Sequence, residues 1–132
     1  MNLLHTFRMI VLGNIPILLI GDDICMKLDS NFIYLKDMYS DSYYPTFLVD
    51  KVKNQIVQVV TFLESGTHTN DAIQAKLDEM TIAINELQEE FDQNDSEIET
   101  VARESIASTV EEILKFFDVD IDTETAIQER DW

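Results

Sequence analysis

The stretch NDAIQAKLDEMTIAINELQEEF, residues 70–91, decides the fold of this chain. Its large apolar residues recur at alternating steps of four and three: Ile73, Leu77, Met80, Ile84, Leu87 and Phe91. This spacing places them on one side of a helix that Asn70 can cap, and such an apolar seam requires a partner helix. The sequence therefore predicts a helical bundle.

Long helices are expected on both sides of this segment. After it, SEIE at 96–99 has the pattern of a capping box, and apolar residues keep a helical period to about residue 117. A short link joins these two helices, so we expect them to pack antiparallel. Before it, a helix should run from Pro45, at its first position, to about Ser65, with Gly66 ending it.

Short helices are expected at the flanks. Asp29 or Ser30 can cap a helix over about 31–40, and Asp122 can cap a last helix that docks Trp132 on the bundle. The predicted class is all-α: a small helical bundle with a long antiparallel helix pair, short flanking helices and an apolar N-terminal arm.

Residues 1–25 form that arm. The apolar run MIVLGNIPILLI at 9–20 is too short to span a bilayer. Pro16 weighs against a central strand, which leaves an edge strand, an arm on the bundle or a disordered tail. We expect one acidic helical domain over 26–132, and we keep open whether the arm belongs to it or whether translation starts at Met26.

The charge excludes whole classes of partner. The chain has 9 Lys and Arg against 26 Asp and Glu, for a net charge of −17. Residues 69–132 alone carry 19 acids and four cations, for a net of −15. Nucleic acid and anionic membranes would be repelled, so we expect neither as a partner. The single cysteine, Cys25, excludes an internal disulfide.

Acids of the 70–91 helix give the leading functional hypothesis. They lie off the apolar seam, and some repeat every seven residues, about 10.5 Å along the axis. Such a column can face a basic protein, so we expect a non-enzymatic binding module of the inhibitor or immunity type. The candidate partner-binding residues are Asp71, Asp78, Glu79, Glu86, Glu90 and Asp92. A homodimer through apolar surface is a further hypothesis.

The alternative is a small enzyme or ligand-binding protein. Its candidate cleft lies in the connection before Pro45 and at the start of the next helix, and consists of Tyr39, Tyr43, Tyr44 and Asp50. The competing interpretation is that the rings cover the end of the bundle while their hydroxyls bond nearby aspartates.

Two carboxylate-rich segments are the candidates for a divalent-metal site within this alternative. One matches positions 1, 3, 5 and 12 of a calcium loop, but Thr123 replaces its glycine: Asp118, Asp120, Asp122 and Glu129. The other, over 86–99, lacks the Glu-x-x-His pairs of carboxylate metal centres. No nucleophile motif is present. We therefore assign no catalytic residue, no metal ligand and no cofactor.

Three stretches carry a family resemblance: YLKDMYSDSYYPTFLVDK at 34–51, EEFDQNDSEIETVARE at 89–104 and ERDW at 129–132. They resemble an uncharacterised family of small acidic bacterial proteins known only as a domain of unknown function, over about residues 27–132. The resemblance implies one all-helical domain in a bacterial cytoplasm. It implies no activity.

Overall fold

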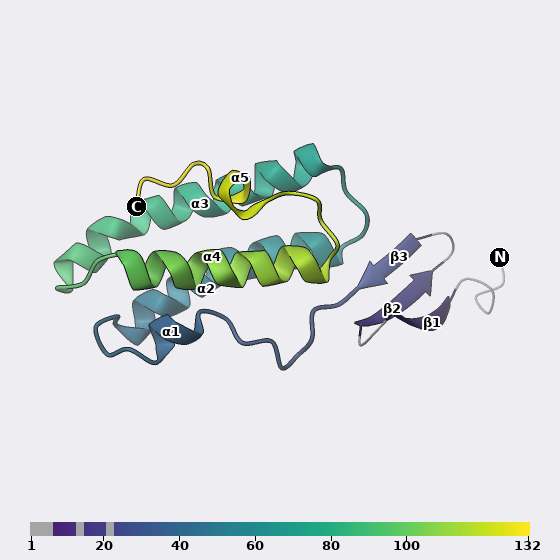
Figure 1. Cartoon of the computed structure of the whole chain (residues 1–132), viewed down its shortest axis with the longest axis horizontal. Helices are drawn as coiled ribbons and strands as arrows, with labels where there is room; N and C mark the ends of the chain where they lie inside the picture. Colours follow the sequence, from purple (N-terminus) through teal and green to yellow (C-terminus); the bar gives the residue numbers. More distant parts are fainter. Residues whose placement is uncertain (1–6, 13–14, 21–22) are drawn as a thin grey trace.

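A small all-α bundle forms most of the chain, as the sequence predicts (Figure 1). The computed structural model describes residues 7–12, 15–20 and 23–132. Its elements in chain order are β1 (Phe7–Leu12), β2 (Ile15–Ile20), β3 (Asp23–Met26), α1 (Lys36–Tyr39), α2 (Thr46–Glu64), α3 (Asn70–Gln93), α4 (Thr100–Phe116) and α5 (Thr123–Ala126). The three long helices alternate in direction along the bundle (Figure 1).

The apolar seam of α3 lies in the core. Five of its six residues are buried and Leu87 is half-buried, within one cluster to which α2 and α4 also contribute. The antiparallel direction expected for α3 and α4 is confirmed (Figure 1). The most extensive backbone contact of α3 with another helix, however, is with α2, which precedes it across the connection 65–69. Valines dominate the buried side of α2, and such short side chains let helix axes come close.

Most helix ends follow the local sequence. Gly66 takes a φ of +144° directly after Ser65, the C-cap of α2, which confirms the expected stop. The cap of α3 is Thr69, one residue before the predicted Asn70, and its Oγ accepts the Ala72 N–H at 3.1 Å. Local residues thus determine both the end of α2 and the start of α3, and only residues 65–69 lie between the two helices.

The predicted capping box at 96–99 is wrong. Helix α4 begins at Thr100, and its N-cap is Glu99, whose carboxylate accepts the Val101 N–H at 3.4 Å. Ser96 instead belongs to the end of α3, because its N–H donates to the Phe91 carbonyl at 3.0 Å. This bond closes the C-terminal turn of α3 and buries Ser96.

The helix predicted over 31–40 is also wrong, since α1 covers only its last turn. Leu35 stops it: this residue takes a φ of 50° and a ψ of 45°, a left-handed conformation that costs a bulky L-residue about 1–2 kcal/mol. Its fully buried side chain and a hydrogen bond from its N–H to Thr109 Oγ1, at 3.0 Å, offset that cost. Asp29 does not cap a helix but accepts the Asn31 N–H in a local turn.

The N-terminal arm contains a three-stranded antiparallel sheet of order β1-β2-β3, which lies beyond one end of the bundle (Figure 1). Pro16 therefore lies in the central strand, against our expectation. At its own position, though, it pairs only with Val11 of β1, because the pairing with β3 starts at Ile17. Pro16 thus occupies a position that is still an edge, where proline is tolerated.

The C-terminal strap, residues 123–132, packs along α3. Asp122 caps α5 as predicted, accepting the N–H of Thr125 at 2.8 Å. Side-chain amides of Gln74 and Asn85 donate to strap carbonyls at 2.9 and 2.8 Å. Trp132 is only 9% exposed, so the predicted docking of the strap on the bundle is confirmed.

Candidate functional site

One side of α3 stays open to solvent and carries carboxylates. Asp71, Glu79, Glu86 and Asp92 are exposed, as the pattern of the seam predicts. Ile82 lies on the same helix and keeps 45% of its surface exposed. We call the exposed residues Asp71, Glu79, Ile82, Glu86 and Glu89 the α3 face.

Two of the candidate partner-binding acids are half-buried and engaged within the protein. Asp78 accepts a hydrogen bond from Gln74 at 2.9 Å. Glu90 binds the Lys51 ammonium of α2 at 2.7 Å. Both differ from Glu86, which makes no ion pair within the described part of the chain. Glu89 was missed by the sequence reasoning, although it follows the exposed Ile82 by seven residues.

The candidate cleft residues form two separate pairs. In the first, the Tyr39 hydroxyl of α1 donates to Asp50 Oδ1 of α2 at 2.6 Å. Burial of the phenol, followed by this hydrogen bond to the carboxylate, raises the pKa of Tyr39 well above its ordinary value of 10.0. The pair joins α1 to α2.

In the second pair, the rings of Tyr43 and Tyr44 meet edge to face with centroids 5.0 Å apart. Tyr44 is buried and its hydroxyl donates to the Glu99 carboxylate at the start of α4. Burial first and this hydrogen bond second raise the pKa of Tyr44. Of the aspartates that the sequence offered as tyrosine partners, only Asp50 is used; Glu99, 55 residues from Tyr44, has no signal in the local sequence.

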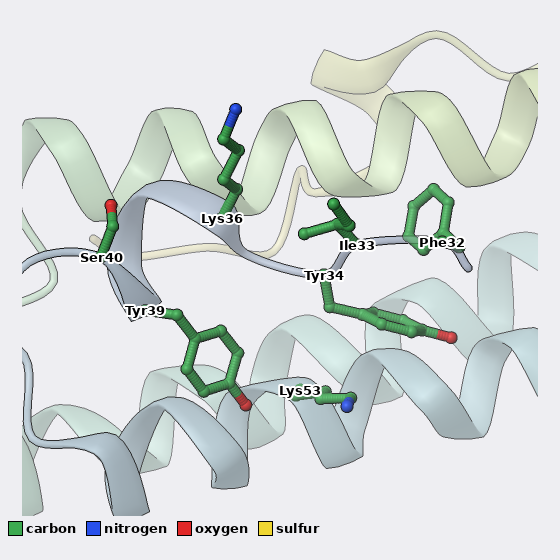
Figure 2. A pocket seen from close by; sticks show the side chains of 7 residues that line it. All are labelled: Phe32, Ile33, Tyr34, Lys36, Tyr39, Ser40 and Lys53. Atoms are coloured by element: carbon green, nitrogen blue, oxygen red, sulfur yellow. The ribbon is translucent and has the colours of Figure 1, made fainter. Parts of the chain in front are cut away.

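A pocket of about 510 Å³ opens beside the first pair, between the segment before α1, α1 itself and α2 (Figure 2). Of the predicted cleft residues it includes only Tyr39. Its other lining residues are Phe32, Ile33, Tyr34, Lys36, Ser40 and Lys53. Sequence reasoning missed this pocket because residues 32–34 were predicted to be helical, whereas they follow a non-helical path that supplies one wall.

In the first of the two carboxylate-rich segments, Asp122 has a structural role. Asp122 Oδ1 serves as the cap of α5, and the backbone N–H of Thr125 holds the pKa of this carboxyl below its ordinary value. Within residues 7–12, 15–20 and 23–132, no three His, Cys, Asp or Glu side chains are grouped so that they could hold a metal ion. In the same ranges, no helix combines the length and the apolar composition needed to cross a bilayer.

Comparison with known proteins gives one match. Neither the curated proteins nor the solved structures contain a match to this chain. A family model described as a family of unknown function, DUF5713, matches residues 28–132, which is the helical domain without β1, β2 and β3. The match covers the same region as the resemblance seen in the sequence, and the chain belongs to this family of unknown function.

Proposed function

We propose that this protein is a non-enzymatic interaction module that binds a basic protein through the α3 face. The observation that carries the proposal is Ile82, an exposed apolar side chain with exposed carboxylates before and after it on the same helix. An apolar centre within a charged rim is the usual anatomy of a protein interface. The opposite side of α3 packs in the core, and Gln74 and Asn85 hold the C-terminal strap.

Electrostatics support the choice of a basic partner. The net charge of −17 attracts cationic surfaces over long range and raises the rate of encounter at low salt. Glu79 is only weakly compensated, since its 3.6 Å ion pair with Lys76 is exposed. The proposal includes a bacterial cytoplasmic setting, supported by the likeness to small bacterial proteins in the three stretches quoted above.

The test uses two double variants that change the net charge equally. Glu79→Gln with Glu86→Gln alters the α3 face, whereas Glu104→Gln with Glu112→Gln alters exposed acids of α4. Tagged full-length proteins would capture partners from a bacterial lysate at low salt, followed by elution at high salt and mass spectrometry. Association rates with the purified partner would then be measured across salt concentrations.

We expect the α3 variant to lose most of the captured basic protein and to associate more slowly, while the α4 variant behaves as the wild type. Equal capture by both variants would refute the α3 face as the binding surface. Light scattering distinguishes the homodimer hypothesis, because a dimer that persists at high salt would point to apolar self-association.

A further inference from the structure

The pocket beside α1 is a wide, open hollow with aromatic walls. Its volume of about 510 Å³ lies within the range of roughly 300–1,000 Å³ typical of small-ligand sites. Phe32, Tyr34 and Tyr39 give it aromatic walls, and Ile33 at the rim remains 65% exposed. A ligand with a planar apolar part would cover this surface.

Lysines supply the polar side of the pocket. Within residues 26–132, Lys51, Lys76, Lys115 and Arg130 form ion pairs with glutamates. Lys36 and Lys53, which both line the pocket, form none in this part of the chain. Lys27 and Arg103 are likewise without an ion pair in this range, so what sets Lys36 and Lys53 apart is their place beside the aromatic walls of the pocket.

The lysines differ in placement. Lys53 Nζ lies 5.1 Å from the centroid of the Tyr34 ring, a cation–π distance that holds the ammonium at the pocket wall. Figure 2 shows Lys53 on the same side as Tyr34 and Tyr39, with Lys36 extending the opposite way. Because the Tyr39 hydroxyl is bound to Asp50, that side chain offers the pocket its ring. Lys53 is therefore the cation closest to the aromatic wall.

The wall is also held in place before any ligand arrives. Leu35 fixes the direction of residues 32–34 by its left-handed backbone and its hydrogen bond to Thr109. Non-glycine residues in this conformation concentrate at functional sites, where the surrounding structure must maintain them. A preformed wall lowers the entropic cost of binding.

The acidity of the whole protein does not forbid an anion here. At physiological ionic strength charges farther away than about 8 Å are largely screened. Helix α3 lies on the opposite side of the bundle from α1 (Figure 1), and the pocket lining itself contains no acid. Two carboxylates lie beyond the lining and each accepts a hydrogen bond: Asp50 from the Tyr39 hydroxyl, and Glu64 from the Leu28 N–H. Burial first and the charge of Glu64 second raise the pKa of Tyr34, so a bound anion must compete with this carboxylate for Lys53.

We propose that this pocket binds a small aromatic carboxylate, its ring against Tyr34 and Tyr39 and its carboxylate at Lys53. The site is independent of the α3 face.

Three probes of one shape and different charge test it: 1-naphthoate, 1-naphthalenemethanol and 1-naphthylmethylammonium. Binding to the full chain would be followed by amide chemical shifts at millimolar probe concentrations. We expect shifts confined to residues 32–40 and around Lys53. Naphthoate should bind roughly two- to fivefold more tightly than the alcohol, as befits one exposed charge pair, and the ammonium most weakly.

Variants identify the cation. Lys53→Met should abolish the preference for the carboxylate over the alcohol, and Lys53→Arg should keep it. Lys115→Met, at an exposed lysine of α4, is the matched control and should behave as the wild type. The proposal fails if no probe binds, if the shifts lie elsewhere, if the three probes bind equally, or if Lys53→Met retains the preference.

Discussion

The hydrogen bond from Leu35 to Thr109 can be measured with an internal control. Thr109 and Thr81 are both buried in long helices, and each donates its hydroxyl to the carbonyl four residues earlier at 2.8 Å. Only Thr109 Oγ1 also accepts a bond from outside its helix, the 3.0 Å bond from the Leu35 N–H. Replacing either threonine by the isosteric valine removes its bond to the helix carbonyl. Only Thr109→Val also removes the acceptor of the Leu35 N–H.

Thr109→Val leaves the buried Leu35 N–H without an acceptor. An unsatisfied buried donor costs about 1–3 kcal/mol, whereas Thr81→Val leaves no group unpaired, because the Leu77 carbonyl keeps its helical bond. We expect Thr109→Val to lower the free energy of unfolding by about 1–3 kcal/mol more than Thr81→Val. Against a total stability of about 5–15 kcal/mol this difference is readily detected.

Urea unfolding, monitored by circular dichroism, gives the free energy of unfolding of each variant. The two values can be compared provided that both variants show the same dependence of this free energy on urea concentration. Hydrogen exchange of the Leu35 amide supplies a local measure, which should quicken in Thr109→Val and stay unchanged in Thr81→Val. Two variants that differ by less than about 0.5 kcal/mol would show that this bond does not maintain the left-handed residue.

Tyr44→Phe should lower the free energy of unfolding by about 1.5–3 kcal/mol, as for a bond to a charged group, measured by urea unfolding. Because folding raises the pKa of Tyr44 above 10.0, the stability that Tyr44 contributes is fully present below pH 10 and is lost as pH rises beyond it, so the variant should show a smaller alkaline loss of stability. Asp122→Ala should loosen the C-terminal strap, seen as a red shift in the emission of Trp132, the single tryptophan. Folding lowers the pKa of Asp122, so the stability that its carboxylate contributes is present above pH 3.8 and is lost as pH falls below that value. If the red shift of Trp132 emission in Asp122→Ala relative to the wild type is the same at all pH values, this role is contradicted. Lys51→Ala should change the free energy of unfolding by less than about 1 kcal/mol, since its ion pair is exposed, and a larger loss would show that the pair is more than a surface contact.

Periodicity and turn residues predicted the parts of the fold that depend on neighbouring residues. The spacing from Ile73 to Phe91 identified the longest helix and its buried side. Gly66 and Asp122 marked a helix end and a helix start because their roles need only local backbone geometry.

The errors arose where a distant residue outweighs local preference. Leu35 leaves the helical conformation because Thr109, 74 residues later, accepts its N–H. Ser96 has the sequence of a helix start, yet the end of α3 uses it. For the candidate sites, the positions of the exposed acids of α3 could be predicted from the apolar seam. The pocket could not, because it forms where the backbone of residues 32–34 passes Lys53, and no sequence spacing predicts that contact.

The separation of 74 residues between Leu35 and Thr109 also bears on the order of folding. Helices α2 and α3 meet across a five-residue connection, so their contacts close a short loop at small entropic cost and should form early. The segment before α1 can dock only after α4 has joined them, and it should be the last to fold and the first to detach. A molecule held in the pocket beside α1 would bind only once this segment has docked, and its binding would slow the detachment of the segment.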